Sequence, residues 1–338
     1  MSNPNPPSGR ARARWPLFVG IAALALYAVF LSRHAAVVAG GADSSGYLNS
    51  ARLFLEGRLQ APLRAPPELG PAASLDAMHF LPQGFFPSRE RGLLNPTYPT
   101  GLPLHLAAAH AVLGARAGTL FILIGAAVAA VALMYRAARD LGLDRSLAAA
   151  GAVTLAAFPV FLFTSIQPLS DTLATAWSLA ALVAGLRASR SARWAGVAGG
   201  AFAMATLVRP TNLLLAPALL ILVGLSPRRL LAFAAGGLPG AAWLAWYNHA
   251  LYGHPLASGY GNIGAAFAIH HGAPTAVHFA KWLALLLPTF LLALPFAAIA
   301  RREFRDRRLA ALAVGFVAIT GCYAFYEVSH EVWWCLRF

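Results

Sequence analysis

Two aspartates stand where apolar runs meet polar sequence, and they are the residues best placed to do chemistry. Asp43 lies within residues 40–57, a stretch whose leucines give one side of a short surface helix an apolar face. Asp171 opens another apolar run, between a serine and a threonine. A carboxylate at a boundary between water and membrane can act as a general base toward a hydroxyl group. Either aspartate could also cap the helix that it begins, so neither position alone separates the two roles.

The composition is that of an integral membrane protein. Hydrophobic residues make up 59% of the chain and charged residues 11%, and the mean hydropathy is +0.62. An ordinary soluble domain carries about 25% charged residues. The two cysteines, Cys322 and Cys335, have no His or Cys pair at zinc-finger spacing nearby. We therefore interpret them as packing residues rather than as a disulfide or a structural metal site.

The basic residues are distributed as in the cytoplasmic loops of a membrane protein. The net charge is +14, and the arginines fall in short clusters between apolar runs, which is the positive-inside pattern. A nucleic-acid surface would instead need basic and stacking aromatic side chains on one folded face, so no nucleic-acid partner is expected. The clusters are Arg10, Arg12 and Arg14; Arg136, Arg139 and Arg145; Arg187, Arg190 and Arg193; Arg228 and Arg229; and Arg301, Arg302, Arg305, Arg307 and Arg308.

Hydropathy and this charge bias predict an all-α, polytopic transmembrane protein of about nine spans. Residues 1–14 are expected to be a disordered cytoplasmic tail, and residues 15–338 a transmembrane domain. Residues 39–116 form its first outer loop, where repeated prolines prevent long helices. The run 102–114 is read as an interfacial or re-entrant helix, because a crossing there would reverse the side of every later arginine cluster. The predicted spans are 15–31, 117–135, 147–165, 172–186, 194–208, 212–225, 230–247, 279–299 and 309–326.

This topology places the chemically capable residues on one face of the membrane. Asp43, Asp171 and Arg209 fall on the outer side, together with His249 and His254 of a second polar loop. Acidic residues at membrane depth are retained mainly where they line a watery cavity or meet a partner. A shared outer cavity therefore explains the two aspartates together better than two separate caps do. The loop histidines lack the compact spacing of metal ligands, so no metal site is indicated.

The order of several motifs resembles the C-type (GT-C) integral membrane glycosyltransferases. Within them, the chain is most similar to the dolichyl-phosphate-mannose-protein mannosyltransferase-like and aminoarabinose-transferase-like group. The resemblance covers nearly the whole chain, although each motif by itself is loose. The motifs are Asp43 at the head of the loop helix, Tyr98-Pro99-Thr100-Gly101-Leu102-Pro103, Ser170-Asp171-Thr172, Arg209-Pro210-Thr211 and the loop from Asn248 to Pro255.

The resemblance implies sugar transfer from a polyprenyl-phosphate donor to a lipid, glycan or protein acceptor. By position, Asp43 matches the catalytic aspartate of the first outer loop, and Asp171 matches the acidic position of the next. Tyr47 and Tyr98 match positions that line the site. Many members carry a second acid where this chain has Ser44, which puts a metal-assisted reaction in doubt, and no cofactor is indicated.

Such a transfer needs a base and a cationic group. Asp43 is expected to accept the proton of the acceptor hydroxyl as its oxygen attacks the anomeric carbon, which gives an inverted product. Arg209, Arg337, His249 or His254 is expected to stabilise the phosphate that leaves. The expected location is the inner (plasma) membrane, among its lipids, with a cytoplasmic N-terminus and the site on the outer face.

A transporter or flippase of lipid-linked sugars is the alternative function. It would also have many spans and helices broken at Pro and Gly. No internal repeat relates the two halves of this chain, however, and a long first outer loop is unusual for a rocking mechanism. Relatives continue past the position of Phe338 into further spans, so we expect the chain to be either a fragment or a minimal member of the group.

Overall fold

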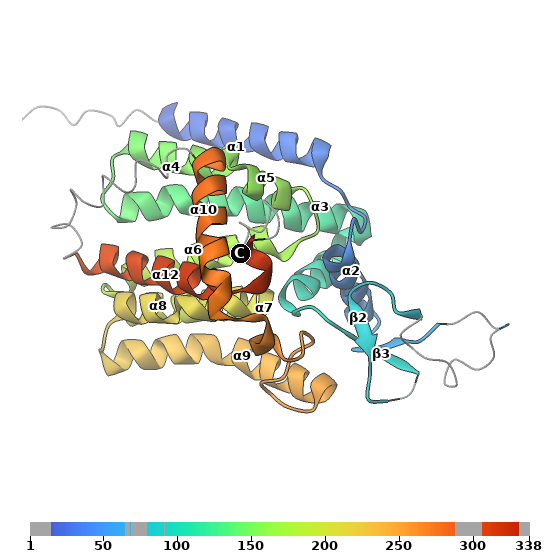
Figure 1. Cartoon of the computed structure of the whole chain (residues 1–338). Coiled ribbons are helices and arrows are strands. Elements are labelled where there is room, and N and C mark those ends of the chain that lie inside the picture. Colours follow the sequence, from blue (N-terminus) through green and yellow to red (C-terminus); the bar gives the residue numbers. More distant parts are fainter. Residues whose placement is uncertain (1–14, 65–67, 69–79, 91, 288–305, 331–338) are drawn as a thin grey trace, which may run out of the picture.

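The chain folds mainly into helices that run alongside one another (Figure 1). The computed structural model describes residues 15–64, 68, 80–90, 92–287 and 306–330. The α-helices are α1 Trp15–His34, α2 Ala42–Leu55, α3 Gly101–Asp140, α4 Arg145–Ala157, α5 Pro159–Ser165, α6 Ser170–Ala188, α7 Ala192–Val208, α8 Ala216–Val223, α9 Pro227–Tyr252, α10 Gly272–Leu286 and α12 Arg307–Ala324. The strands are β1 Ala61–Pro62, β2 Phe85–Pro87 and β3 Leu93–Pro96.

The longest helix, α3, is two helices joined at a break. Gly114 has φ 77° and ψ 166°, a conformation outside the helical region that glycine adopts without a Cβ clash. The sequence predicts separate segments at 102–114 and 117–135, and the break confirms that division. The first segment begins against α7, where a Cβ on Gly101 would lie 2.3 Å from the Val208 nitrogen.

A second break separates α4 from α5. Phe158 has extended backbone, Pro159 begins the next helix, and the two axes differ by 61°. Proline causes such a bend because it lacks an N–H and restricts the residue before it. The sequence analysis treats residues 147–165 as one span, and the structure shows that this span is sharply bent.

Three of the described helices are long and apolar enough to cross a membrane by themselves. They are α3, α9 and α12, and the bent α4–α5 pair makes a fourth when it is counted as one span. The second half of the predicted span 279–299 lies outside the described residues. The structure therefore confirms a polytopic helical fold, while the total of about nine spans stays a prediction.

Ion pairs join the helices at one end of the bundle, which we call the arginine end. The buried Asp140 carboxylate accepts from Arg187 of α6 at 2.7 Å and from Arg136 at 3.0 Å. Its backbone carbonyl accepts from Arg308 Nη1 of α12 at 3.2 Å. In this way the end of α3, the end of α6 and the start of α12 are held together.

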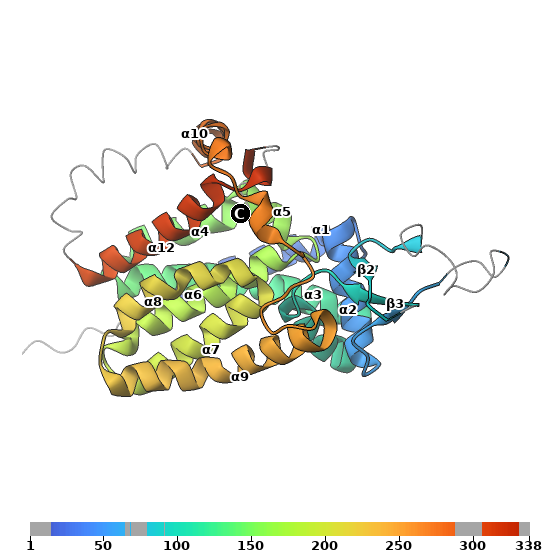
Figure 2. The same ribbon diagram turned by 60° about the horizontal axis from the view of Figure 1, so that its bottom comes forward.

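Helix α2 and a small sheet lie at the opposite end, which we call the α2 end (Figures 1 and 2). The sheet was not expected from the proline-rich sequence of the first loop. Its strands pair antiparallel in the order β1-β3-β2, and prolines stand at the strand ends, where a missing N–H is tolerated. Asn95 of β3 is buried and donates to the Leu251 carbonyl of α9 at 3.0 Å, so the sheet is anchored to the bundle.

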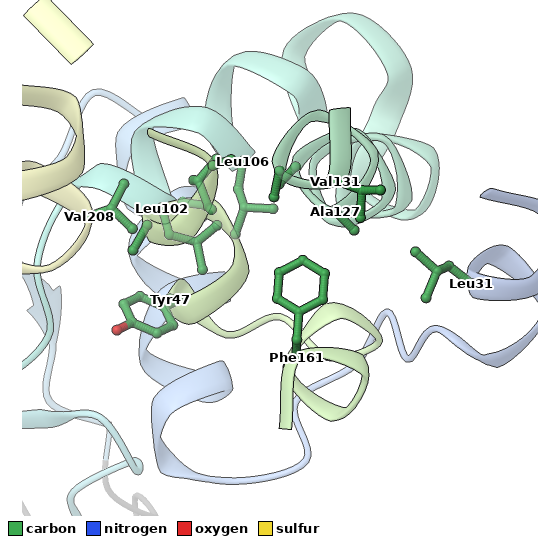
Figure 3. Close-up of a cluster of buried hydrophobic side chains, with 14 of the residues drawn as sticks. Leu31, Tyr47, Leu102, Leu106, Ala127, Val131, Phe161 and Val208 are labelled. Carbon is green, nitrogen blue, oxygen red and sulfur yellow. The ribbon is translucent and has the colours of Figure 1, made fainter. Parts of the chain in front are cut away.

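Buried side chains from several helices of the bundle hold α2 in place (Figure 3). Tyr47 of α2 packs in one cluster with Leu102 and Leu106 of α3, Phe161 of α5 and Leu173 of α6. By contrast, large apolar side chains of α1 and α9 face outward. An apolar exterior of this kind fits helices surrounded by lipid rather than water.

Candidate active site

Asp43 does not cap the helix in which it lies. Helix α2 begins at Ala42, and Gly41 is its N-cap residue. The hydroxyl of Ser44 instead accepts from the amides of Gly40, at 2.9 Å, and Gly41, at 3.1 Å. The Asp43 carboxylate is thus in the first turn, where the helix dipole favours a negative charge. The capping role that the sequence left open belongs to Ser44.

Asp171 forms an ion pair with Arg209. Asp171 is the second residue of α6, is 9% exposed, and leaves the N-cap position to Leu169. Arg209 ends α7 in an extended conformation just before Pro210. Its Nη1 donates to Asp171 Oδ1, which joins the start of α6 to the end of α7. A charge at this depth needs such a partner, because burying an isolated charge is costly.

Tyr47 connects α2 to the start of α6, next to Asp171. It lies one turn after Asp43, is 3% exposed, and donates its hydroxyl to Ser170 Oγ at 3.0 Å. Its phenol is within electrostatic reach of Asp43, Arg209 and Asp171. Burial raises the pKa of this phenol well above its ordinary value, so Tyr47 is a neutral hydrogen-bond donor at physiological pH.

Three further tyrosines complete the arrangement. The ring of Tyr98 lies 5.2 Å from that of Tyr47 and 6.0 Å from that of Tyr260. Tyr260 interacts electrostatically with Asp43 and Arg209, and Tyr323 at the end of α12 does so with Arg209. We call the whole group the α2-end cluster: Asp43, Tyr47, Tyr98, Asp171, Arg209, Tyr260 and Tyr323.

Glycines let the loops of the cluster approach one another closely. A Cβ on Gly46 would lie 2.3 Å from Cδ2 of Tyr98, and one on Gly84 would lie 2.5 Å from the Gly46 Cα. A Cβ on Gly259, next to Tyr260, would lie 2.3 Å from the Thr97 carbonyl oxygen. The tyrosine contacts therefore depend on the absence of side chains at these positions.

The sequence predicted five of the seven cluster residues as site residues and missed Tyr260 and Tyr323. Tyr260 stands between two glycines in a polar loop, which is a signal that could have indicated it. Tyr323 lies within the apolar run of α12, where nothing in the local sequence distinguishes it from a core residue. Its place in the cluster follows from the direction in which α12 crosses the bundle.

The predicted histidines and the last arginine are not brought into the cluster by the described contacts. Helix α9 continues to Tyr252, so His249 is an exposed residue of its last turn, which corrects the prediction that it lies in a loop. His254 is exposed, and its Nδ1 accepts from the Leu256 amide at 3.1 Å. Arg337 lies outside the described residues. Within the described ranges, no group of three or more His, Cys, Asp or Glu side chains is arranged to hold a metal ion.

The bundle, its broken helices and the α2 end together have the fold of the C-type (GT-C) membrane glycosyltransferases. The chain is similar to the crystal structure of ArnT from Cupriavidus metallidurans bound to undecaprenyl phosphate, with a TM-score of 0.61. The match covers 96% of this chain and 58% of the ArnT chain, at 12% sequence identity. No protein-family model and no curated protein matches the sequence. At this identity the likeness shows the fold, and it confirms the predicted architecture.

Proposed function

We propose that this protein is a membrane glycosyltransferase that takes a sugar from a polyprenyl-phosphate donor. The observation that carries the proposal is the α2-end cluster, in which Asp43 and the Asp171–Arg209 ion pair are all within electrostatic reach of Tyr47. It is supported by the shared fold with ArnT, a protein whose crystal structure is bound to undecaprenyl phosphate. A carboxylate and a guanidinium around one position are the two charges that this transfer needs.

Asp43 is the general base of the proposed reaction. Its carboxylate accepts the proton of the acceptor hydroxyl, while the hydroxyl oxygen forms a bond to the anomeric carbon of the sugar. The bond between that carbon and the phosphate oxygen breaks on the opposite side, and its electron pair leaves with the polyprenyl phosphate. The sugar is therefore transferred with inversion. The amides of Gly40 and Gly41 at the start of α2 donate to Ser44 and not to Asp43.

Arg209 stabilises the phosphate that leaves, and Asp171 positions Arg209. The ion pair fixes the guanidinium at the junction of α6 and α7, where Tyr47 and Tyr260 are within electrostatic reach. A fixed positive charge helps most where negative charge develops in the transition state. This gives Asp171 a different role from Asp43: it acts through Arg209 rather than on the substrate.

The acceptor is a lipid, glycan or protein, and the cluster faces the outer side of the membrane in this proposal. The arginine end carries the basic turns, which the positive-inside rule places in the cytoplasm. The α2 end is then outside. His249, His254 and Arg337 stay proposed contacts to the phosphate or the sugar.

The experiment is transfer of radiolabelled sugar from a panel of polyprenyl-phosphate donors in membranes that contain the wild-type chain or Asp43→Asn. We expect label in the acceptor fraction for wild type and a loss on the order of 10²–10⁴-fold for Asp43→Asn. Glu56→Gln is the matched control, since Glu56 is an exposed acid at the end of the same helix, paired only with its neighbour Arg58 among the described residues.

Glu56→Gln should transfer at the wild-type rate. Equal transfer by wild type and Asp43→Asn would contradict the assignment of the base. If neither protein transfers sugar and both move a labelled lipid-linked sugar across the bilayer at the same rate, the transporter function is favoured over the transferase.

A further inference from the structure

A half-open cavity with a mostly apolar lining lies on the far side of α2 from the cluster. Its volume is about 420 Å³, and it is bordered by the connection between α1 and α2, by α2 itself and by the break in α3. Asn49 and Arg52 line it from α2, and His110 and Arg116 line it from either side of Gly114. The cavity thus lies beside the break in α3.

The position of Arg52 separates this cavity from the α2-end cluster. Arg52 follows Asp43 by nine residues, and at about 100° per residue in an α-helix the two side chains leave α2 in nearly opposite directions. Tyr47 shares the Asp43 side, and Arg52 and Asn49 share the other. One helix thus presents the proposed catalytic residues on one face and the cavity on the other.

Two arginines give the cavity its charge. Arg52 and Arg116 are both exposed at its edge, and within the described ranges neither of them forms an ion pair with a carboxylate. Behind them, His110 is 8% exposed and its Nε2 is 2.9 Å from the Thr119 hydroxyl, which is itself 1% exposed. The floor of the cavity is therefore a fixed polar pair, and its mouth is cationic.

The surroundings of the cavity are apolar. Val37 and Val38 line one wall, and Val38 is 67% exposed. Just before the break in α3, Val112 is 81% exposed and Leu113 is 47% exposed. Apolar side chains that project beside two arginines match the two parts of a membrane lipid, whose acyl chains and phosphate would lie against them respectively.

We propose that this cavity binds the phosphate headgroup of an anionic membrane phospholipid, with Arg52 and Arg116 as its ligands. The headgroup would connect α2 to the second half of α3, because Arg52 comes from α2 and Arg116 follows the break at Gly114. This binding is independent of the sugar donor, which the proposed function places on the opposite face of α2.

The test is lipid retention by the purified full chain, measured by native mass spectrometry with dioleoylphosphatidylglycerol and dioleoylphosphatidylcholine in competition. Wild type should preferentially retain dioleoylphosphatidylglycerol, the anionic lipid of the two. Arg52→Gln with Arg116→Gln should lower that preference about thirty-fold, because each arginine near a membrane surface contributes about one kcal/mol toward an anionic lipid. Arg58→Gln with Arg64→Gln is the control, since it removes the same charge from exposed arginines of the same loop.

An unchanged preference in the first double variant, or an equal loss in the control, would overturn the proposal. A photoactivatable phosphatidylglycerol tests wild type without any variant: crosslinks are expected in residues 37–52 and 110–119, and crosslinks confined to other segments would refute the site.

Competition with inorganic phosphate tests whether the ligand is a lipid headgroup or free phosphate. If inorganic phosphate binds the lipid-free protein and displaces the lipid at equal concentration, the cavity is a site for free phosphate and the lipid assignment is wrong.

Discussion

Asp171 and Arg209 depend on each other in this structure, and their variants should show it. Asp171→Asn and Arg209→Gln each leave one buried charge without its ion-pair partner, which costs roughly 3–5 kcal/mol. The double variant removes both charges and should recover much of that stability. Sugar transfer should stay low in all three proteins, because the cation near the leaving phosphate is lost or misplaced.

Unfolding in detergent and transfer activity, measured on the same preparations, separate these effects. Stability losses that simply add in the double variant would show that the two side chains act independently. Recovery of activity together with stability would show that Arg209 has only a structural role.

Gly46 tests whether the aromatic contacts of the cluster matter. A Cβ there would lie 2.3 Å from the Tyr98 ring, so Gly46→Ala must displace Tyr98 or α2. A displacement of about 1 Å near reacting groups can reduce a rate on the order of 10²-fold. Gly41→Ala is the control at the start of the same helix, where a Cβ would meet nothing within 4 Å and the backbone is extended. Equal transfer rates for the two variants would remove Tyr98 from the site.

At the residue scale, the sequence predicts which charged residues belong to the site better than it predicts which residues are in contact. Asp43, Asp171 and Arg209 are recognisable because charged residues are rare in so apolar a chain. That Arg209 pairs with Asp171, 38 residues away in the sequence, depends on how α6 and α7 pack. Tyr323 is missed for the same reason, since an apolar run gives no sign of which side chain reaches the cluster.

Helices α7 and α9 pack closely through glycines in the middle of α7, the helix that Arg209 follows. A Cβ on Gly199 would lie 1.9 Å from the Phe233 carbonyl oxygen, and one on Gly236 would lie 2.0 Å from that of Gly196. Small residues allow such close approach between helices in a membrane. Gly199→Val should separate the two helices, lower the unfolding temperature in detergent and reduce transfer by displacing Arg209.

Gly125→Val is the matched control in α3, because a Cβ at Gly125 would meet nothing within 4 Å. It should unfold and transfer like wild type. If Gly199→Val does the same, the close approach of α7 and α9 is not needed for the site.

At the element scale, the break at Gly114 is predicted, whereas the bend between α4 and α5 and the small sheet are not. The run 102–114 is too short to span and contains two histidines, so its separation at Gly114 can be anticipated from length and polarity. The strands have only two to four residues each and include three prolines, so neither alternation nor β-propensity marks them. They form because Asn95 and the buried Leu94 and Phe85 find partners on α9 and α2.

The two ends of the molecule differ: the arginine end carries the basic turns, and the α2 end carries the α2-end cluster. Leu225, beside Arg228, and Leu256, after α9, are 89% and 88% exposed and lie at opposite ends of α9. In a background of Cys322→Ser and Cys335→Ser, Leu256→Cys should react with a membrane-impermeant maleimide in intact cells. Leu225→Cys should react only after permeabilisation. The reverse result would place the cluster in the cytoplasm and contradict transfer on the outer face.

Composition and charge were sufficient to predict the architecture of the whole molecule, but not the number of crossings. Short and bent apolar helices such as α4, α5, α7 and α8 have the hydropathy of spans without the usual length. Their path through a bilayer is set by packing against neighbours, which hydropathy does not encode. The likeness to ArnT therefore shows the fold of the molecule and leaves its span count a prediction.

The most direct test of the account separates donor binding from transfer in purified protein reconstituted into liposomes. With one polyprenyl-phosphate sugar, donor affinity and the rate of polyprenyl phosphate release are measured for wild type and for Asp43→Asn. We predict that Asp43→Asn binds the donor within about three-fold of wild type and releases polyprenyl phosphate on the order of 10²–10⁴-fold more slowly. Equal release rates, or a wild type that binds the donor and transfers no sugar to any acceptor class, would contradict it.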